Sequence, residues 1–397
     1  MKTVAVLGGG PAGSFAAERL ARAGLKTVIF DEKLAWEKPC GGGLTFKAYD
    51  AYPFLIENDT PKKIVTSTVL SAPAAGAARL HLEHPLVIYS RFDLNKMLLN
   101  RAEKAGAQLE KERVIGLERS GSRWSLRTRA GTAEADFVVV ATGARNSLRS
   151  VGTAWTASDT MYALGYYVPT SQEHIDIQFL KNLEGYIWVF PRCGHLSVGI
   201  CGKGEPAHAL RARLERYMEV KGIATKDATF YSHVLPSLER KSWRRNRVAG
   251  DGWVAVGDAA GLVDPITGEG LYYAMRSGDL AGQVLIADTP VSQKADAYRT
   301  GLLQDFVADL EFGSCLARRV FMGRFLFRTV PNQMVAFIRR SARFNSLMQD
   351  LFAGTQPYLG LKQRLLRNLN GTLNEVIMNF FLHRMISSEG PVSDGAG

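Results

Sequence analysis

Hydrophobic positions at the start of the chain follow two different periods. Residues 2–7 form a short apolar run typical of a buried strand, and small and aliphatic residues then recur at helical spacing over 14–24. Gly24 is the candidate C-cap of this helix. A second apolar run over 26–31 completes the pattern, which predicts a β-α-β unit.

The middle of the chain changes period twice. A helical repeat runs from Phe92 to Gly106, and the apolar run at 135–143 predicts a parallel strand that meets a glycine turn. From about Met161, polar and apolar residues alternate in short segments, which predicts an antiparallel sheet with one face exposed. These segments span 162–169, 175–180, 185–191 and 195–202.

The last third of the chain repeats the strand, glycine-rich turn and helix seen at the start. A strand and glycine-rich turn over 252–270 precede a helix over 271–285. We expect helices from Asp305 onward, up to a tail at 387–397 that is too small and polar to be ordered. The pattern predicts an α/β nucleotide-binding fold with an inserted antiparallel-sheet domain and a helical C-terminal region.

Composition restricts the class of protein. Hydrophobic residues make up 46% of the chain and charged residues 22%, which is typical of a globular protein. No apolar stretch approaches the roughly 18 to 20 residues that cross a bilayer, and the first residues enter a strand instead of a signal sequence, so we expect a cytoplasmic location. The four cysteines show no close pairing, and no histidine cluster is present, so we predict reduced thiols and no metal.

Positive charge is concentrated near the C-terminus. The net charge is +11, and ten basic residues stand against the single acid Asp350 between Phe312 and Asn374. Aromatic residues interleave with the arginines over 318–330, which favours peripheral contact with the anionic inner face of a membrane. A solvated face of a packed helix explains the pattern equally well. No nucleic-acid motif occurs, so we expect no nucleic-acid partner.

A glycine motif follows the first strand. Gly8, Gly10 and Gly13 have the GxGxxG spacing, and Asp31 closes the second strand eighteen residues after Gly13. These glycines permit a tight turn, close approach of a pyrophosphate and helix packing, and the helix N-terminus stabilises the phosphates. We therefore predict a dinucleotide site in which Asp31 accepts hydrogen bonds from ribose hydroxyls. A glycine turn without a ligand is the alternative.

A second glycine-rich segment carries an acid directly after a buried strand. Asp258 would be costly there unless a polyol chain used it, and small neighbours leave room for a flat ring. A helix that begins near Gly270 would direct backbone donors at the pyrimidine edge of a flavin. An ordinary loop with a capping aspartate is the alternative. The segment comprises Gly257, Asp258, Ala259, Ala260, Gly261, Pro265, Gly268, Glu269 and Gly270.

Six segments resemble one family in sequence and order. They are GGGPAG, EKPCGGGL, RFDLNKMLLNRAEKAGAQL, VVVATGARNSLRS, GYIWVFP and GDAAGLVDPITGEGLYYAM. Together they resemble the geranylgeranyl reductase family, a branch of the para-hydroxybenzoate hydroxylase-like flavoproteins, over about residues 2–285. The resemblance implies a Rossmann-type FAD-binding fold. The FAD contacts that it implies are Gly8, Gly10, Pro11, Ala12, Gly13, Asp31, Glu32, Cys40, Gly41, Arg91, Ala141, Thr142, Gly143, Gly257, Asp258, Pro265, Gly268 and Gly270.

The resemblance and the periodicity together predict a discontinuous domain organisation. The FAD-binding domain would comprise 1–45, 91–160 and 246–310, and the substrate-binding domain 46–90 and 161–245. A helical C-terminal region would follow over 311–386, ending in a disordered tail at 387–397.

The family's reaction is the reduction of isolated alkenes in prenyl chains, such as geranylgeranyl groups or quinone side chains. No carbonyl stabilises the developing charge on such an alkene, so a proton donor must act together with hydride from reduced FAD. The resemblance places Cys40 at the reaction face, as a proton donor or as part of the pocket wall. A small buried hydrophobic residue is the alternative role for a lone cysteine.

Three aromatic residues share one face of a predicted strand. Tyr186, Trp188 and Phe190 alternate with period two, so they could line an apolar tunnel for a prenyl substrate or pack the inner face of the sheet. No second GxGxxG motif appears. The electron donor would therefore be NAD(P)H that docks transiently, or a ferredoxin-like protein.

Two other functions fit the same fold. The segment YIWVFP resembles the WxWxIP signature of flavin halogenases, so a flavin monooxygenase or halogenase is the main alternative. Turnover without oxygen would distinguish a reductase from both. A non-catalytic lipid or quinone carrier that keeps FAD for structure is the second alternative.

Overall fold

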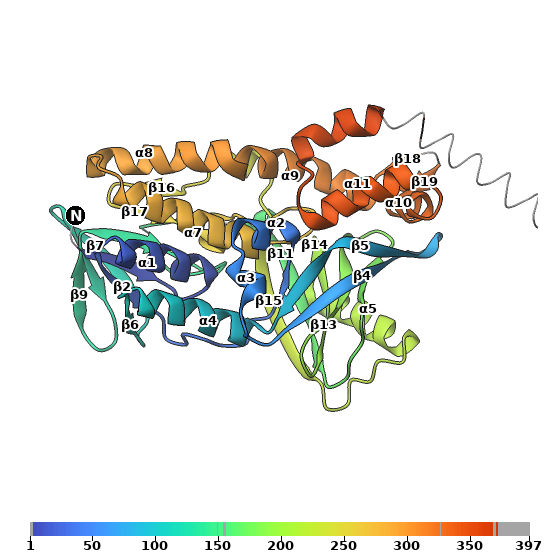
Figure 1. Ribbon diagram of the computed structural model, residues 1–397, viewed down its shortest axis with the longest axis horizontal. Helices are drawn as coiled ribbons and strands as arrows, with labels where there is room; N and C mark the ends of the chain where they lie inside the picture. The colour runs from blue at the N-terminus through green and yellow to red at the C-terminus, as the bar shows by residue number, and fades with distance from the viewer. Residues whose placement is uncertain (1–2, 149, 154–155, 326, 368–370, 372–397) are drawn as a thin grey trace, which may run out of the picture.

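The computed structural model describes residues 3–148, 150–153, 156–325, 327–367 and 371, and two large β-sheets dominate it (Figure 1). The first has six strands in the order β16-β17-β10-β1-β2-β6. They are β1 (Thr3–Leu7), β2 (Lys26–Phe30), β6 (Gln108–Glu110), β10 (Phe137–Val140), β16 (Ala249–Gly250) and β17 (Trp253–Ala255). All neighbours pair in parallel except β16, which is antiparallel to β17.

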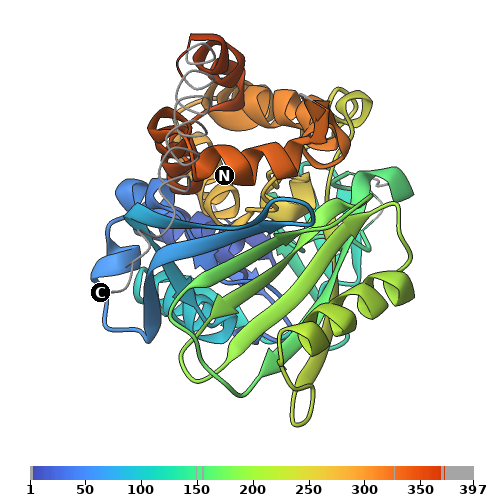
Figure 2. The ribbon, with the colours of Figure 1, turned by 90° about the vertical axis from the view of Figure 1, so that its right-hand side faces the viewer.

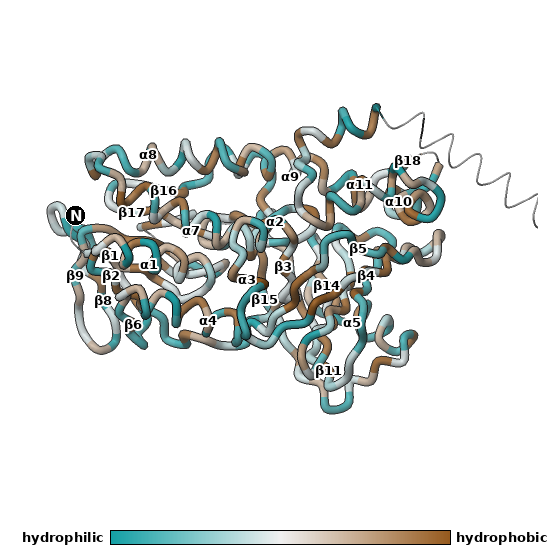
Figure 3. The backbone as a smooth tube through the Cα atoms, in the orientation of Figure 1, coloured by the Kyte–Doolittle hydropathy of each residue, from teal (hydrophilic) through white to brown (hydrophobic). Residues whose placement is uncertain are grey.

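Helices cover this sheet and explain its apolar strands. Every residue of β10 is buried, as expected for a parallel strand with both faces covered. Helix α1 (Pro11–Arg22) packs between α4 (Arg91–Lys104) and α7 (Leu271–Ile286), and α8 (Val291–Leu302) lies on α7. Apolar segments gather in the sheet, whereas α8 at the surface is mixed (Figure 3). A small sheet of β7 (Gly116–Ser120), β8 (Arg123–Arg127) and β9 (Thr132–Ala135) contacts β1 and β10.

The second sheet has eight strands in the order β15-β11-β14-β13-β12-β4-β5-β3. They are β3 (Gly43–Leu44), β4 (Lys62–Ala72), β5 (Gly76–Tyr89), β11 (Thr160–Val168), β12 (Ile175–Phe179), β13 (Glu184–Pro191), β14 (Leu196–Lys203) and β15 (Thr229–Pro236). The four segments predicted to alternate are antiparallel neighbours within it. The sheet as a whole is mixed, because β12 pairs in parallel with β4 of the inserted β4-β5 hairpin.

Helices cover both faces of the second sheet, on different sides of it (Figure 2). Helix α5 (Ala207–Val220) packs on β11 and β14. On the other face, α9 (Ala308–Met322), α10 (Val330–Ile338) and α11 (Ala342–Ala353) contact β13, β4 and β5. Short helices at α2 (Phe46–Ala51), α3 (Phe54–Glu57) and α6 (Arg240–Trp243) complete the connections. The predicted α/β class with a second sheet and C-terminal helices is confirmed. The domain boundaries stay a prediction.

The prediction that the chain is helical from Asp305 onward is wrong at one place. A hairpin of β18 (Arg324–Phe325) and β19 (Arg328–Thr329) separates α9 from α10. Gly323 allows this exit, because a Cβ there would overlap the carbonyl of Arg319 in the last turn of α9. The C-terminal residues 372–397, including the predicted tail, lie outside the described residues. Within the described part of the chain, no helix is long and apolar enough to cross a bilayer.

Candidate active site

The glycine turn between β1 and α1 brings backbone atoms so close together that side chains would not fit at two of its positions. Gly8 has a φ of +117°, and a Cβ there would overlap the carbonyl of Ala141. A Cβ at Gly13 would overlap the carbonyl of Gly8, so Gly13 is needed for helix packing. In contrast, a Cβ at Gly10 would meet no atom of the described residues within 4 Å. The space beside Gly10, at the N-terminus of α1, is therefore open to a ligand.

The distant Gly-Asp segment converges on the same turn. A Cβ at Gly257 would lie 3.1 Å from the Cβ of Ala12, the residue that follows Pro11 in the first turn of α1. Asp258 follows Gly257 and forms an ion pair with Lys38, with 2.8 Å between Nζ and Oδ2. Burial would raise the pKa of Asp258, but Lys38 and other nearby cations lower it below its usual value. An ionised carboxylate therefore stands beside the glycine turn.

The carboxylate of Asp31 binds backbone N–H groups in the structure, in addition to the ribose contact that the sequence predicts. Its carboxylate accepts hydrogen bonds from the backbone N–H groups of Gly9, Lys33 and Leu34, at 2.7 to 2.9 Å. These bonds tie the end of β2 to the glycine turn, and a ribose would have to share the same oxygens. The neighbouring Glu32 is exposed and reaches Arg113 at 3.4 Å. The ribose contact of Asp31 stays a prediction.

Two buried polar side chains beside this turn have unused hydrogen-bonding atoms. Arg91 is only 3% exposed, and its Nε has no hydrogen-bond partner within the described residues. The hydroxyl of Thr142, which follows β10 and Ala141, is also buried without a partner there. Gly143 comes next, with a φ of +75° and open space at its Cβ position. Buried groups of this kind are costly unless a ligand satisfies them, so they indicate a polar or anionic occupant.

A large apolar cavity of about 1370 Å³ lies between the second sheet and the C-terminal helices. Cys40 and Gly41 form part of its wall, and a Cβ at Gly41 would touch the ring of Phe190 at 3.4 Å. The Cys40 sulfur accepts a hydrogen bond from the N–H of Gly42 at 3.3 Å. Gly268 and Gly270 lie on the same wall, whereas Pro265 does not and instead packs near Gly313.

The three predicted aromatic residues all line this cavity. The Tyr186 hydroxyl donates to the carbonyl of Thr267, which ties the second sheet to the Gly268 turn. Trp188 also packs tightly on β14, because a Cβ at Gly199 would overlap its ring. Trp188 therefore fits both predicted roles, because it packs against the sheet and also lines the cavity. Contact of these residues with a substrate stays a prediction.

The sequence analysis placed Glu269 in the glycine-rich segment but gave it no role of its own, although its neighbours Gly268 and Gly270 were predicted FAD contacts. Glu269 lies on the cavity wall between Gly268 and Gly270, and burial raises its pKa to about 7. Its carboxylate accepts a hydrogen bond from the N–H of Tyr272 at 2.7 Å. The signal available in the sequence was an acid enclosed by glycines before an apolar helix, but its exposure to the cavity depends on the C-terminal helices.

Lys38 and His233 were also missed. Burial and the neighbouring Lys38 lower the pKa of His233 to about 4, so the imidazole is neutral at physiological pH. His233 comes from β15 and Lys38 from the loop after β2, and no pattern in the sequence links the two. No group of three or more possible metal ligands occurs within the described ranges.

Comparison with known proteins identifies the family. The model of the FAD dependent oxidoreductase family (DAO) matches residues 69–279, more than half of the chain. The chain is 31% identical over 306 residues to digeranylgeranylglycerophospholipid reductase 2 of Methanothermobacter thermautotrophicus, covering 71% of this chain and 77% of that protein. The chain belongs to the geranylgeranyl reductase family of FAD-dependent oxidoreductases. This flavoprotein is therefore an enzyme.

Two solved structures share the fold of the flavoprotein. One is a geranylgeranyl bacteriochlorophyll reductase-like protein from Thermoplasma acidophilum, with a TM-score of 0.76, 24% identity and coverage of 92% of this chain and 99% of that chain. The other is a flavin-dependent brominase, with a TM-score of 0.67, 18% identity and coverage of 88% and 93%. At these identities the likeness shows the fold alone, and it includes both a reductase-like protein and a halogenating enzyme.

The residues at the glycine turn fit FAD. The flavoprotein offers open space at Gly10, the Arg91 Nε and Thr142 hydroxyl that find no partner among the described residues, and the ionised Asp258. Phosphates would take the helix N-terminus and the arginine, and a polyol chain would take the aspartate. The cavity wall at Cys40 and Gly268 would then receive the ring. These assignments remain predictions for the individual residues.

Proposed function

We propose that the flavoprotein saturates carbon-carbon double bonds in a long prenyl chain. The large apolar cavity carries this proposal, because its wall holds Cys40, Glu269 and the predicted aromatic residues together. A prenyl chain offers only apolar surface, so it matches such a wall. The similarity to a digeranylgeranylglycerophospholipid reductase supports the same substrate class.

Two side chains of the cavity could hold the proton that the reaction requires. Bound, reduced FAD supplies the hydride. Cys40 is one candidate acid, and Glu269 is the second, because a carboxyl group with a pKa of about 7 is partly protonated at neutral pH. The hydrogen bond from Tyr272 fixes the orientation of the Glu269 carboxyl group. Both acids lie on the cavity wall, so either could give its proton directly to a bound chain.

The electrons come from outside the chain. The sequence has no second dinucleotide motif, so we propose that NAD(P)H docks transiently or that a ferredoxin-like protein reduces the flavin. Either donor leaves the cavity wall available to the lipid.

The reaction class is testable without the natural donor. Protein reduced with dithionite under anaerobic conditions is expected to convert geranylgeranyl lipids to products heavier by one hydrogen pair for each reduced double bond, as measured by mass spectrometry. Protein that consumes the lipid only when oxygen is admitted would instead support a monooxygenase or, with halide present, a halogenase. The similarity of the fold to that of a flavin-dependent brominase is the observation that favours this alternative, oxygen-dependent function.

We also propose that the β18-β19 hairpin rests on an anionic membrane. Phe325 is 40% exposed, Phe327 is fully exposed, and the flanking Arg324 and Arg328 are exposed as well. Arg324 and Phe325 also line the cavity, so a lipid could pass from the membrane to the site. Not every basic residue of this region faces lipid, because Arg339 donates to the carbonyls of Ala75 and Ala77.

Charge reversal in the hairpin tests this contact. The variant R324E/R328E is expected to lose at least about tenfold in binding to vesicles that contain acidic lipid, since each basic residue near the surface contributes about 1 kcal/mol. Co-sedimentation measures the loss, and F327S should weaken binding further. The control is K104E/R129E, which reverses two exposed charges at the end of α4 and between β8 and β9, elements that lie on the opposite side of the molecule from the hairpin (Figure 1). Equal binding by both double variants would exclude the hairpin as the contact.

A further inference from the structure

Arg192 is an unusually enclosed arginine beside the cavity. Its side chain is 0% exposed, although it sits in the short turn that follows β13. Its backbone N–H donates to the carbonyl of His195 at 2.9 Å and closes this turn. A charge without solvent is costly unless other groups pair with it, so the neighbours of this guanidinium must satisfy it.

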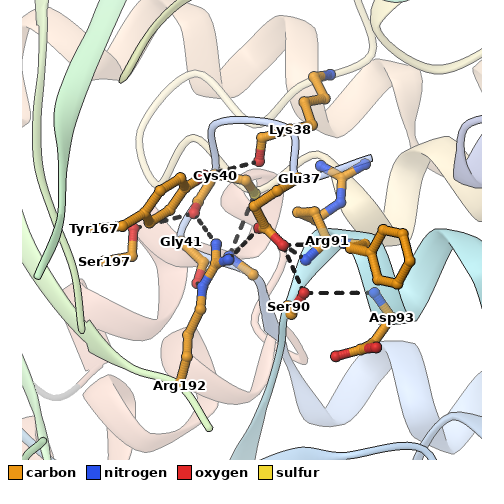
Figure 4. Close-up of polar contacts among 12 residues, drawn as sticks. Glu37, Lys38, Cys40, Gly41, Ser90, Arg91, Asp93, Tyr167, Arg192 and Ser197 are labelled. Atoms are coloured by element: carbon orange, nitrogen blue, oxygen red, sulfur yellow. Dashed lines mark hydrogen bonds and ion pairs between the residues drawn. The ribbon is translucent and has the colours of Figure 1, made fainter. Parts of the chain in front are cut away.

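The guanidinium binds the loop that carries Cys40, as Figure 4 shows. It donates hydrogen bonds to a carboxylate oxygen of Glu37, to the carbonyl of Cys40 and, at 3.3 Å, to the carbonyl of Gly41. Ser197 on β14 donates to the same Cys40 carbonyl at 3.2 Å. These contacts hold the backbone carbonyls of Cys40 and Gly41, directly after the thiol, and the side chain of Glu37, three residues before it.

Glu37 extends this network to helix α4. Its carboxylate accepts hydrogen bonds from the Ser90 hydroxyl and from the backbone N–H groups of Arg91 and Phe92, at the N-terminus of the helix (Figure 4). Burial would raise the pKa of Glu37, but Arg192 and these hydrogen bonds lower it below the usual value. The carboxylate is therefore ionised throughout the neutral range, and the ion pair persists there.

We propose that Arg192 is a positioning residue. Its hydrogen bonds to the carbonyls of Cys40 and Gly41 fix the thiol on the cavity wall. Its ion pair with Glu37 fixes the first turn of α4, which carries Arg91, because Glu37 also binds the backbone of that turn. One buried cation thereby joins three parts of the site: the aromatic strand β13, the Cys40 loop and the helix that presents Arg91. The inference rests on the proposed function where it places Cys40 at the reaction face.

The test measures the site without using a prenyl lipid. The first readout is the alkylation rate of Cys40 by iodoacetamide, followed by mass spectrometry of its peptide. The second is the dissociation constant of FAD. The variants are R192M, R192K and E37Q, and the control is R213M. Arg213 makes a similar two-nitrogen contact with Glu205, at α5 on the face of the sheet away from the cavity.

R192M is expected to change the Cys40 alkylation rate at least about tenfold. It is also expected to raise the dissociation constant of FAD at least about tenfold, which corresponds to about 1.4 kcal/mol of binding free energy. E37Q should shift both values in the same direction. R192K should recover part of the loss, because it keeps the charge but offers one nitrogen instead of three. R213M should stay within about twofold of the unchanged protein, since its half-buried ion pair with Glu205 lies at α5 and makes no contact with the Cys40 loop or with the first turn of α4 among the described residues.

Two results would overturn the proposal. One is R192M with an unchanged alkylation rate and unchanged FAD affinity. The other is R192K behaving no better than R192M, because the contacts would then not depend on the cation. If R192M does not fold, E37Q and R192K report the same two values. Failure of prenyl reduction would leave these results intact, so the two proposals can be separated.

Discussion

Alanine at Gly10 is expected to remove FAD and leave the fold intact. The added methyl group would meet no atom within 4 Å in the part of the chain that the structure describes, and Gly10 has an ordinary φ of −71°, so the substitution costs little folding free energy. The same methyl group would occupy the space that a pyrophosphate needs at the N-terminus of α1. We expect the dissociation constant of FAD to rise at least about 100-fold, or about 2.7 kcal/mol. Flavin fluorescence titration measures it, and thermal unfolding monitors the fold.

Two other glycines give matched comparisons. A Cβ at Gly360 would have its nearest neighbour, Gln356, at 3.6 Å and would touch no residue of the predicted FAD site among the described residues, so G360A should bind FAD normally. Gly13 is the opposite case, because a Cβ there would overlap the Gly8 carbonyl, and G13A should lose both the fold and the flavin. A yellow G10A protein with unchanged affinity would contradict the assignment of the glycine turn to FAD.

Glutamine at Glu269 is expected to slow prenyl reduction by about 100-fold or more, the usual contribution of a positioned general acid. The amide oxygen of glutamine can still accept the hydrogen bond from Tyr272, so the start of α7 is preserved. Reduction of the flavin by dithionite should be unchanged, because that step does not use the acid. Single-turnover mixing of reduced protein with a geranylgeranyl lipid separates the two steps.

The pH dependence provides an independent check on Glu269. An acid must be protonated to donate, so the rate of prenyl reduction should fall as the pH rises through about 7, the raised pKa of this group. The E269Q variant should lack that decline. Because the folded pKa exceeds the usual 4.5, the free energy of unfolding should also decrease as the pH rises from 4.5 towards 7, and E269Q should remove this contribution. A variant C40S that abolishes turnover while E269Q retains it would assign the proton to Cys40.

The local parts of the fold were predictable from short patterns. The glycine motif, the helix that follows it and the strand ending at Phe30 depend on neighbours within about thirty residues. The alternating segments from Met161 became antiparallel neighbours for the same reason, since period two fixes which side chains face the core. The β18-β19 hairpin was missed because its six residues carry both aromatic and basic side chains, which also suit an amphipathic helix.

The contacts of the site were less predictable. Lys38 and Asp258 are 220 positions apart, and Arg192 is 155 positions from Glu37. The C-terminal helices complete the cavity around Glu269, although the family resemblance ended near Leu285. No spacing rule connects such residues.

The sequence by itself determined the FAD-binding class, the alternation of strands and helices, and the residue types beside the glycine turn, because these follow from local geometry and from side-chain chemistry. Only the tertiary structure decided that Lys38 pairs with Asp258, that the C-terminal helices enclose a cavity, and that the half-buried Glu269 and the buried Arg192 lie at or beside it. Burial and long-range ion pairing depend on the packing of distant segments, and they set both the pKa of an acid and the partners of a charge.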